Sequence, residues 1–253
     1  MADAIVRLAA VSVSYRAGSG GLISAIRDIS LIVRSGEITG LLGESGSGKS
    51  TLGAVLAETL PPSARMTAGS VEWRCSRAAA IPQSPSAIFS PYLRCGAHLR
   101  DILRARGVAG ARVKTEMQRC LAAAGLPQER RADRAWPHEL SGGELQRMAV
   151  ARALAMQPAL LIADEAAAAL DTIHASALIA RIARLRSELG LSVLWITHDP
   201  RELLGFADRV LTMHGGRIGE EASASEFARG ETGPITRRLI AAIPQGPVAE
   251  AGP

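Results

Sequence analysis

The stretch GESGSGKST, residues Gly43 to Thr51, decides the fold of this chain. It matches the pattern G-x-x-x-x-G-K-[ST] and lies between an apolar run that we interpret as a strand and a segment with helical spacing. Glycines let the backbone turn its N–H groups inward, and the start of a helix adds partial positive charge there. The pattern therefore predicts a loop that cradles the phosphates of a nucleotide, with contacts from Gly43, Ser45, Gly46, Gly48, Lys49, Ser50 and Thr51.

The lysine of this loop is unusual for the chain. Only two of the 29 cationic residues are lysines, Lys49 and Lys114, because arginine is used almost everywhere else. A lysine that persists in such a sequence suggests a need for ammonium chemistry. In loops of this kind the lysine reaches the β- and γ-phosphates, and the next residue, here Ser50, holds Mg²⁺. We expect Thr51 to lie near the α-phosphate.

Composition excludes several other classes of protein. The chain has 253 residues, 47% of them hydrophobic, and no apolar run of the roughly 18 residues that a membrane span needs. No secretory signal is visible at the start. The three cysteines form no CxxC or CxxH pattern, so we expect free thiols in a reducing compartment. The net charge is +5, but the arginines are scattered and no aromatics lie among them, so we expect no nucleic-acid partner.

Strand and helix patterns alternate along most of the chain. Residues 5–14 alternate like a strand, and Ser30–Gly43 is interpreted as two strands separated by a turn. A helix is predicted from Thr51 to Leu60, ending before two prolines. Residues 84–140 carry helical patterns and few strand signals, and strands and helices then alternate to about residue 219. This is an α/β pattern with a helical insertion.

The stretch LLIADEAAAALD, Leu160–Asp171, has two possible structures. Four consecutive alanines favour a helix, which would make Asp164 and Glu165 ordinary surface charges. The apolar run before them instead favours a buried strand that ends in two carboxylates. Asp164 would then hold the water shell of Mg²⁺, and Glu165 would polarise an attacking water as a general base.

A second anion site is suggested by LSGGELQR, Leu140–Arg147. Ser141 can cap the helix that we predict over residues 142–156, and the N–H groups at a helix start attract anions. Taken alone, a Ser-Gly-Gly helix start is common. Its place downstream of the phosphate loop and upstream of the Asp164 strand makes it informative.

Together these motifs resemble the ATP-binding cassette family, whose signature is LSGGQ followed by an apolar strand with terminal acids. The resemblance runs from Tyr15 to about Pro244. It implies a P-loop NTPase (RecA-like) core with an N-terminal antiparallel β subdomain and an inserted α-helical subdomain. The implied division is 1–83 and 141–232 for the core, 84–140 for the helical subdomain and 233–253 for the tail.

The resemblance also assigns roles to single residues. In the family two cassettes dimerise head to tail, so Ser141, Gly142 and Gly143 would contact the γ-phosphate of ATP bound to a partner cassette. Glu144 replaces the usual glutamine. The remaining positions implied are Gln83 near Mg²⁺ and the attacking water, His198 at the γ-phosphate, Tyr15 stacking on adenine, and Asp171 crossing the dimer interface.

One segment departs from the family. Between Glu165 and Leu170 the usual Pro-Thr-Thr-x is replaced by Ala166, Ala167, Ala168 and Ala169. The loop has lost a rigid proline and two hydroxyls, which puts its geometry and the rate of hydrolysis in question.

Two further stretches resemble the ATPases of peptide and nickel importers. These are Leu60–Trp73 and Gly233–Pro244; in the second, Pro234, Thr236, Leu239 and Pro244 match, while the alternative is an exposed tail. The resemblance implies a membrane permease as partner, a second cassette, an extracytoplasmic solute-binding protein and a peripheral place on the cytoplasmic face of the membrane. The alternatives are a non-transport ATPase acting on nucleic acid or ribosomes, and a cassette of a split exporter. Neither the cargo nor the identity of the second cassette follows from the sequence.

Overall fold

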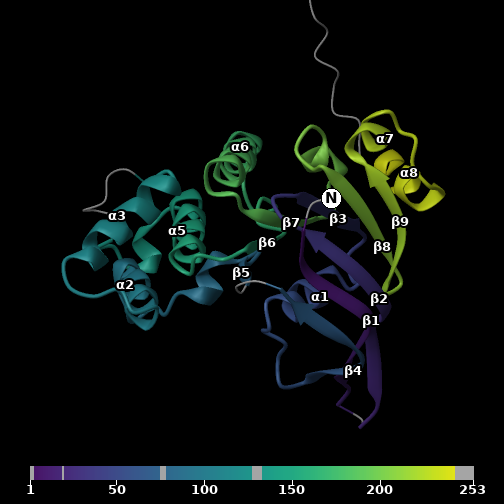
Figure 1. Ribbon diagram of the computed structural model, residues 1–253, viewed down its shortest axis with the longest axis horizontal. Coiled ribbons are helices and arrows are strands. Elements are labelled where there is room, and N and C mark those ends of the chain that lie inside the picture. The colour runs from purple at the N-terminus through teal and green to yellow at the C-terminus, as the bar shows by residue number, and fades with distance from the viewer. Residues whose placement is uncertain (1–2, 19, 75–77, 127–132, 243–253) are drawn as a thin grey trace, which may run out of the picture.

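The computed structural model describes residues 3–18, 20–74, 78–126 and 133–242. It contains two sheets and a group of helices to one side of them (Figure 1). Every helix in these ranges is too short or too polar to span a lipid bilayer.

Cys95 and Cys120 are buried free thiols, as expected. Cys75 and Pro244 lie outside the described residues.

The first sheet has three antiparallel strands in the order β2-β1-β4. They are β1 (Ala4–Arg16), β2 (Leu22–Arg34) and β4 (Ala64–Trp73). The strands expected at residues 5–14 and 30–34 are confirmed. β4 runs from Ala64 to Trp73 because these residues pair along β1.

The second sheet has six strands in the order β5-β6-β7-β3-β8-β9, parallel except for β9. These strands are β3 (Ile38–Gly43), β5 (Ala78–Ile81), β6 (Leu160–Asp164), β7 (Ser192–Thr197), β8 (Arg209–His214) and β9 (Arg217–Ser223). In a parallel sheet all carboxyl ends lie at one edge, which is where ligands bind in open α/β sheets. The phosphate loop follows β3, and Glu165 follows β6.

Alternating side chains of the central strands build two cores. On β7, Val193 and Trp195 pack on one side with the helices α5 (Gly142–Ala155) and α6 (Thr172–Leu189). Leu194 and Ile196 pack on the other side with α1 (Lys49–Leu56) and the three-stranded sheet. Successive side chains of a strand point to opposite faces, and here both faces are covered. Every position is therefore buried, and the strand appears as a continuous apolar run in the sequence.

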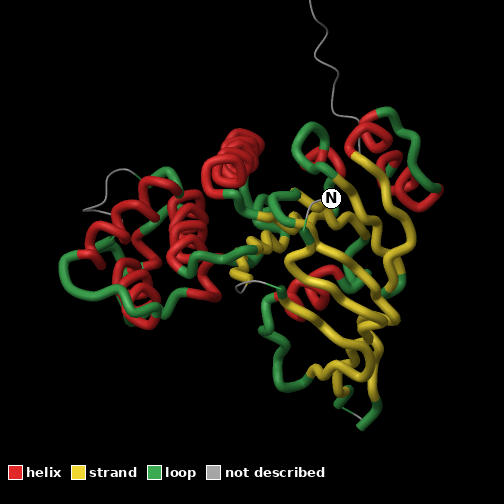
Figure 2. Tube along the Cα trace, in the orientation of Figure 1, coloured by secondary structure: helices red, strands yellow, loops and turns green. Residues whose placement is uncertain are grey.

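Three helices cluster to one side of the sheets (Figure 2). α2 (Cys95–Ala105) and α3 (Arg112–Ala123) pack against α5, which also contacts β5. The short η1 (Pro85–Ile88) and η2 (Pro137–Glu139) flank the α2–α3 pair in sequence. The remaining helical segments are η3 (Pro200–Leu203), α7 (Ala224–Ala228) and α8 (Pro234–Ala241). The expected α/β fold with a helical insertion is confirmed. The domain boundary at residue 140 stays a prediction, because α5 contacts both the α2–α3 pair and β5 of the large sheet.

α1 ends four residues earlier than we predicted from the prolines. Glu58 adopts a left-handed backbone conformation (φ 55°). The amide of Thr59 then donates to the carbonyl of Ala54 at 2.9 Å, and that of Glu58 donates to Val55 at 3.2 Å. This pair of bonds is a Schellman motif, which satisfies the last carbonyls of the helix and stops it before the prolines.

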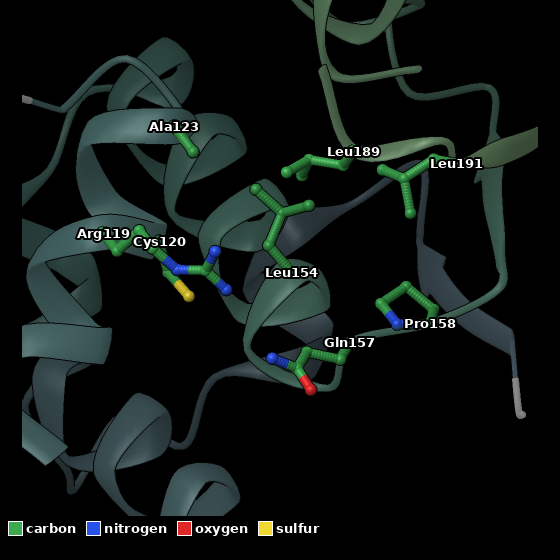
Figure 3. A pocket seen from close by; sticks show the side chains of 8 residues that line it. All are labelled: Arg119, Cys120, Ala123, Leu154, Gln157, Pro158, Leu189 and Leu191. Atoms are coloured by element: carbon green, nitrogen blue, oxygen red, sulfur yellow. The ribbon is translucent and has the colours of Figure 1, made fainter. Parts of the chain in front are cut away.

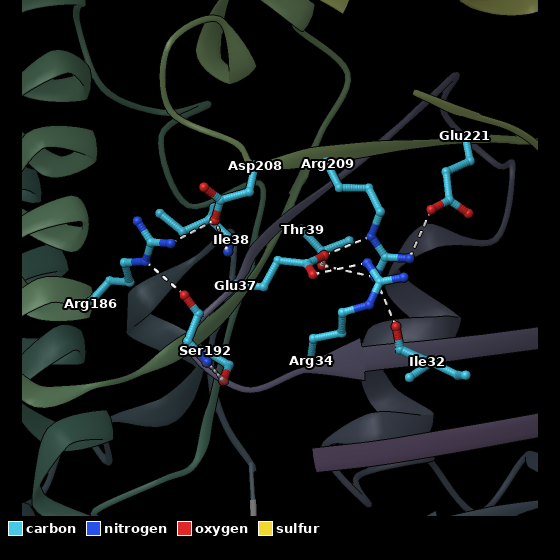
Figure 4. Close-up of polar contacts among 11 residues, drawn as sticks. Ile32, Arg34, Glu37, Ile38, Thr39, Arg186, Ser192, Asp208, Arg209 and Glu221 are labelled. Atoms are coloured by element: carbon cyan, nitrogen blue, oxygen red, sulfur yellow. Dashed lines mark hydrogen bonds and ion pairs between the residues drawn. The ribbon is translucent and has the colours of Figure 1, made fainter. Parts of the chain in front are cut away.

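A buried arginine joins the two sheets (Figure 4). The Arg209 side chain on β8 donates to the Glu37 carboxylate at 2.6 Å, to Glu221 of β9 at 3.1 Å and to the Ile32 carbonyl of β2 at 2.8 Å. Burial raises the pKa of Glu37. The charge and hydrogen bond of Arg209, together with bonds from Arg34 and Thr39, lower it by more than burial raises it, so the net pKa is below its ordinary value.

The C-terminal segment matching the importer motif contains α8, which packs on the edge of the six-stranded sheet. Thr236 in α8 is only 2% exposed, and its hydroxyl lies 2.6 Å from that of Thr212 on β8. The Glu220 carboxylate of β9 accepts bonds from the amides of Ile235 and Thr236 at 2.7 and 2.9 Å. A carboxylate at a helix N-terminus satisfies amides that have no partner within the helix.

Candidate functional site

The phosphate loop is shaped by glycines at the end of β3. Gly48 has a φ of 102°, and a Cβ there would come within 2.6 Å of the Ala25 carbonyl oxygen. Any other residue would meet both a backbone strain and a steric clash. The sequence after β3 therefore folds into a tight loop whose last residues begin α1.

Lys49 is enclosed by this loop. Its side chain is 4% exposed, and its ammonium donates to the carbonyls of Gly43 and Glu44 at 2.8 and 2.9 Å. Burial lowers the pKa of Lys49, while the charges of Glu165 and Asp164 act in the opposite direction. The ammonium thus lies at the inner wall of the loop, facing the two carboxylates at the end of β6.

Ser50 and Asp164 are brought together from different elements. The Ser50 hydroxyl, in the first turn of α1, donates to Asp164 Oδ1 at 3.1 Å. Burial raises the pKa of Asp164, and the neighbouring Glu165 raises it further, whereas the bond from Ser50 and the charge of Lys49 lower it. A serine hydroxyl and a carboxylate at this distance are oxygen donors of the kind that Mg²⁺ prefers.

Glu165 lies at the centre of a polar cluster. Its Oε2 accepts a hydrogen bond from Gln83 Nε2 at 3.1 Å. Its Oε1 lies 3.5 Å from His198 Nδ1 and 4.0 Å from Lys49 Nζ. These partners follow β5 and β7 and begin α1, so three strand ends and the phosphate loop converge on one carboxylate.

The backbone of Glu165 is strained. Its φ is 47°, a left-handed conformation that residues with a side chain adopt rarely. Its amide donates to the Ile196 carbonyl of β7 at 2.9 Å, which fixes the residue at the end of β6. Such strain concentrates at functional sites, where the surrounding structure holds a side chain in one position.

The four alanines after Glu165 form turns rather than a helix. Ala166 and Ala167 are 2% and 3% exposed, so they pack into the core. The strand interpretation of LLIAD is confirmed, and the helix that alanine propensity favours is wrong here, because β6 pairs with β5 and β7 on both sides. A pocket of about 390 Å³ adjoins this loop and His198.

Asp171 caps α6. Its Oδ1 accepts from the amide of His174 at 2.9 Å, and its Oδ2 lies 2.7 Å from His174 Nδ1. Hydrogen bonds from His174 hold the pKa of Asp171 below its ordinary value. We missed the role of His174 in the sequence, although an acid three residues before a histidine at a helix start could have indicated it.

The Ser-Gly-Gly segment begins α5 as predicted. Ser141 accepts from the amide of Glu144 at 3.3 Å, and Glu144 Oε2 accepts from the amide of Ser141 at 2.9 Å. Within the described residues, no hydrogen bond joins Ser141, Gly142 or Gly143 to the phosphate loop. The structure therefore gathers Lys49, Ser50, Gln83, Asp164, Glu165 and His198 in one place but leaves the Ser-Gly-Gly segment and Asp171 outside that cluster.

Tyr15 lies on β1 beside the phosphate loop. Its hydroxyl is 3.2 Å from the Thr51 hydroxyl of α1. This contact places the ring next to the loop, but its stacking on a base stays a prediction.

Two further observations concern possible metal ligands and a pocket away from this site. The described residues contain no group of three or more His, Cys, Asp or Glu side chains that could hold a metal ion alone. The pocket of about 310 Å³ in Figure 3 lies elsewhere, at the opposite ends of β6 and β7, and none of the cluster residues lines it.

A phosphate loop after β3 of a parallel sheet, with an acid pair at the end of β6 two places away, defines a P-loop nucleoside triphosphatase. The family model for "ABC transporter" matches residues 26–168. The chain belongs to the ABC transporter family, and it is an ATP-binding and ATP-hydrolysing subunit of such a transporter.

Individual relatives agree with this assignment. The oligopeptide transport ATP-binding protein OppD of Escherichia coli (strain K12) is 30% identical over 96% of this chain and 77% of its own length. The ATP-binding cassette MJ0796, solved as a dimer bound to ADP and Pi after hydrolysis, is 26% identical. It aligns with a TM-score of 0.76 over 87% of this chain and 98% of its own. The cassette cbiO1 from Clostridium perfringens, at 23% identity over 96% of both chains, has a TM-score of 0.74 and shares the fold.

Proposed function

We propose that this chain powers the uptake of peptides, nickel or a metal chelate through a separate membrane permease. The name of the OppD relative and the importer-like stretches at Leu60–Trp73 and Gly233–Pro244 support this substrate class. The observation that carries the ATPase part is the convergence of Lys49, Gln83 and His198 on the Glu165 carboxylate.

The proposed roles in hydrolysis follow from these positions. Glu165 accepts a proton from the attacking water, because a carboxylate fixed by several partners is oriented for general-base work. Gln83 and His198 position that water and the γ-phosphate of the substrate. Lys49 exchanges its carbonyl partners for the β- and γ-phosphates, which neutralises their charge.

Mg²⁺ is part of this proposal. Ser50 and Asp164 would hold it, with Gln83 nearby, since they present oxygen donors on one side of the loop. When bound, it neutralises charge on the phosphates as they separate.

A second cassette completes the proposed assembly. Ser141 and Gly142 are exposed and lie outside the Glu165 cluster, which fits their contacting ATP bound to another cassette. Asp171, also exposed, would cross the same interface. The dimer in which MJ0796 was solved supports such a pair. The partner is a second copy of this chain or a related cassette.

The permease would dock on the proposed helical subdomain, residues 84–140. Tyr92 and Leu93, between η1 and α2, are 85% and 42% exposed although both are large and apolar. Exposed apolar side chains in the segment that follows Gln83 in sequence would receive a cytoplasmic helix of the permease. The chain would then be peripheral on the cytoplasmic face, with an extracytoplasmic solute-binding protein delivering the cargo.

Capture with membrane proteins tests this function. The tagged chain is purified in mild detergent from its own cells, and co-purifying permease subunits are identified by mass spectrometry. Tyr92→Ser combined with Leu93→Ser should reduce permease recovery, whereas Leu189→Ser, at an exposed position on α6, should not. Stoichiometric DNA or ribosomes without any membrane protein would contradict the proposal, and cargo efflux rather than uptake in vesicles would favour a split exporter.

A further inference from the structure

A second polar pocket lies beside the Ser-Gly-Gly segment. It has a volume of about 200 Å³ and is formed by α5 and α6 together with the residues that follow α3. Its walls carry Gly125, Gly143, Gln146, Arg147, His174 and Arg181. On α5 these positions are i, i+3 and i+4, so they form one stripe that faces the corresponding stripe of α6.

Hydrogen-bond donors in this pocket have no acceptors. Gln146 is 3% exposed, and its Nε2 is buried without a partner. The Nε of Arg147 is likewise buried and unpaired. Leaving a buried donor unsatisfied costs free energy, so native structures rarely keep such groups without a bound acceptor.

Two guanidinium groups converge on the pocket. A Cβ built at Gly125 would lie 3.2 Å from Arg181 Nη2 and 3.5 Å from Arg147 Cδ, so both side chains pass beside this glycine. A Cβ at Gly143 would lie 3.5 Å from Arg147 Nη1 and 3.4 Å from His174 Cδ2. In the described part of the chain neither arginine forms an ion pair, and the nearby Asp171 is occupied by His174.

Two permanent positive charges and an unpaired amide around one pocket require an anion with several acceptor oxygens. A tetrahedral oxyanion fits best, because guanidinium groups bind phosphate through paired N–H groups. ATP hydrolysis by this family releases such an ion. The pocket adjoins the proposed γ-phosphate contact through Gly143, but Ser141 and Gly142 do not line it, so the two sites overlap only at that residue.

We infer that Arg147, Arg181 and Gln146 form a site for inorganic phosphate behind the Ser-Gly-Gly segment. Phosphate bound there joins the end of α3 to α5 and α6. It thereby couples the product of hydrolysis to the packing between the helical group and the core. The inference concerns binding alone and does not depend on the proposed cargo or permease.

Calorimetric titration with inorganic phosphate tests the site. Lys49→Ala weakens phosphate binding at the phosphate loop, so titration of this variant reports the pocket. In that background Arg181→Gln should weaken binding about tenfold to a hundredfold, because a hydrogen bond to a charged group is lost. Arg184→Gln, which removes an exposed guanidinium one turn further along α6, should leave the affinity unchanged.

Two outcomes would overturn the site. One is loss of all phosphate binding on Lys49→Ala alone, which would assign it to the phosphate loop. The other is equal affinity with and without Arg181. Should the Lys49 variant fail to fold, the His174 ring resonances provide a second readout: phosphate should shift them in the wild-type chain and not in Arg181→Gln. ATP turnover, measured separately, keeps failure of the proposed function distinguishable from failure of this site.

Discussion

The side chain of Lys49 is constrained by burial and by its hydrogen bonds. It is one of two lysines in an arginine-rich chain, it is almost fully buried, and its ammonium bonds two loop carbonyls. A guanidinium is larger, planar and always charged, so it cannot occupy the same space or reproduce the same bonds. The sequence bias and the geometry therefore lead to the same conclusion.

Lys49→Arg should weaken ATP binding by at least about tenfold, since contacts to a charged ligand are lost. Lys114→Arg is the matched control, because Lys114 is exposed on α3 and its replacement should leave affinity unchanged. Equilibrium binding of a fluorescent ATP analogue measures both. Equal affinities for the two variants would show that the ammonium itself is not needed.

Much of the residue chemistry could be predicted from sequence. Lys49, Asp164 and Glu165 lie in short motifs whose spacing fixes Lys49 at a helix start and the two acids at a strand end. The contact of His198 with Glu165 and the strained φ of Glu165 could not be predicted, because they depend on β5, β6 and β7 lying side by side. The donors around Gln146 were also missed, since helix periodicity alone marks that face as packed.

At the scale of elements, two segments differ from what their local sequence favours. The four alanines after Glu165 form turns because β6 is held between two strands. α1 stops at Leu56 because Glu58 adopts a left-handed conformation, although the prolines lie further on. β1 was predicted almost in full because its apolar residues alternate, whereas β2 begins at Leu22, eight residues before the strand that we expected from Ser30.

The docking of α8 should depend on pH through Glu220. Burial raises the pKa of Glu220, but bonds from the Thr236 hydroxyl and from the amides of Thr236 and Ile235 outweigh burial, so the net pKa is below its ordinary value. The stabilisation is therefore present above the ordinary pKa and is lost as pH falls through the folded-state pKa.

Glu220→Gln should cost about 1–3 kcal/mol at pH 7, the range for a lost hydrogen bond to a charged group. Urea unfolding of both chains at pH 7 and at decreasing pH measures the difference, which should shrink in acid. Glu231→Gln, at an exposed position, serves as the control. A difference that stays constant with pH would mean that the carboxylate charge does not hold α8.

On the scale of the whole molecule, Arg209 connects the two sheets. Its partners lie on β2, on β9 and at the residue before β3. Replacing it leaves Glu37 as a half-buried carboxylate without its main partner. Breaking a buried pair from one side is strongly destabilising.

Arg209→Leu should lower the free energy of unfolding by about 3–5 kcal/mol. Arg229→Gln, which breaks an exposed pair with Glu231, should have a much smaller effect because solvent screens such a pair. Chemical denaturation of each chain provides the comparison. Similar costs for the two variants would argue against a structural link between the sheets through Arg209.

We propose that the strand ends of the large sheet are gathered around Glu165 to hydrolyse ATP. Glu165→Gln keeps the size and the polar contacts of the side chain but removes the base. ATP binding should remain near wild type while steady-state turnover falls by about 10²- to 10⁴-fold, the contribution of general-base catalysis. Glu188→Gln, at an exposed position on α6, should match the wild type in both assays. Undiminished phosphate release by the Glu165→Gln chain would contradict the account.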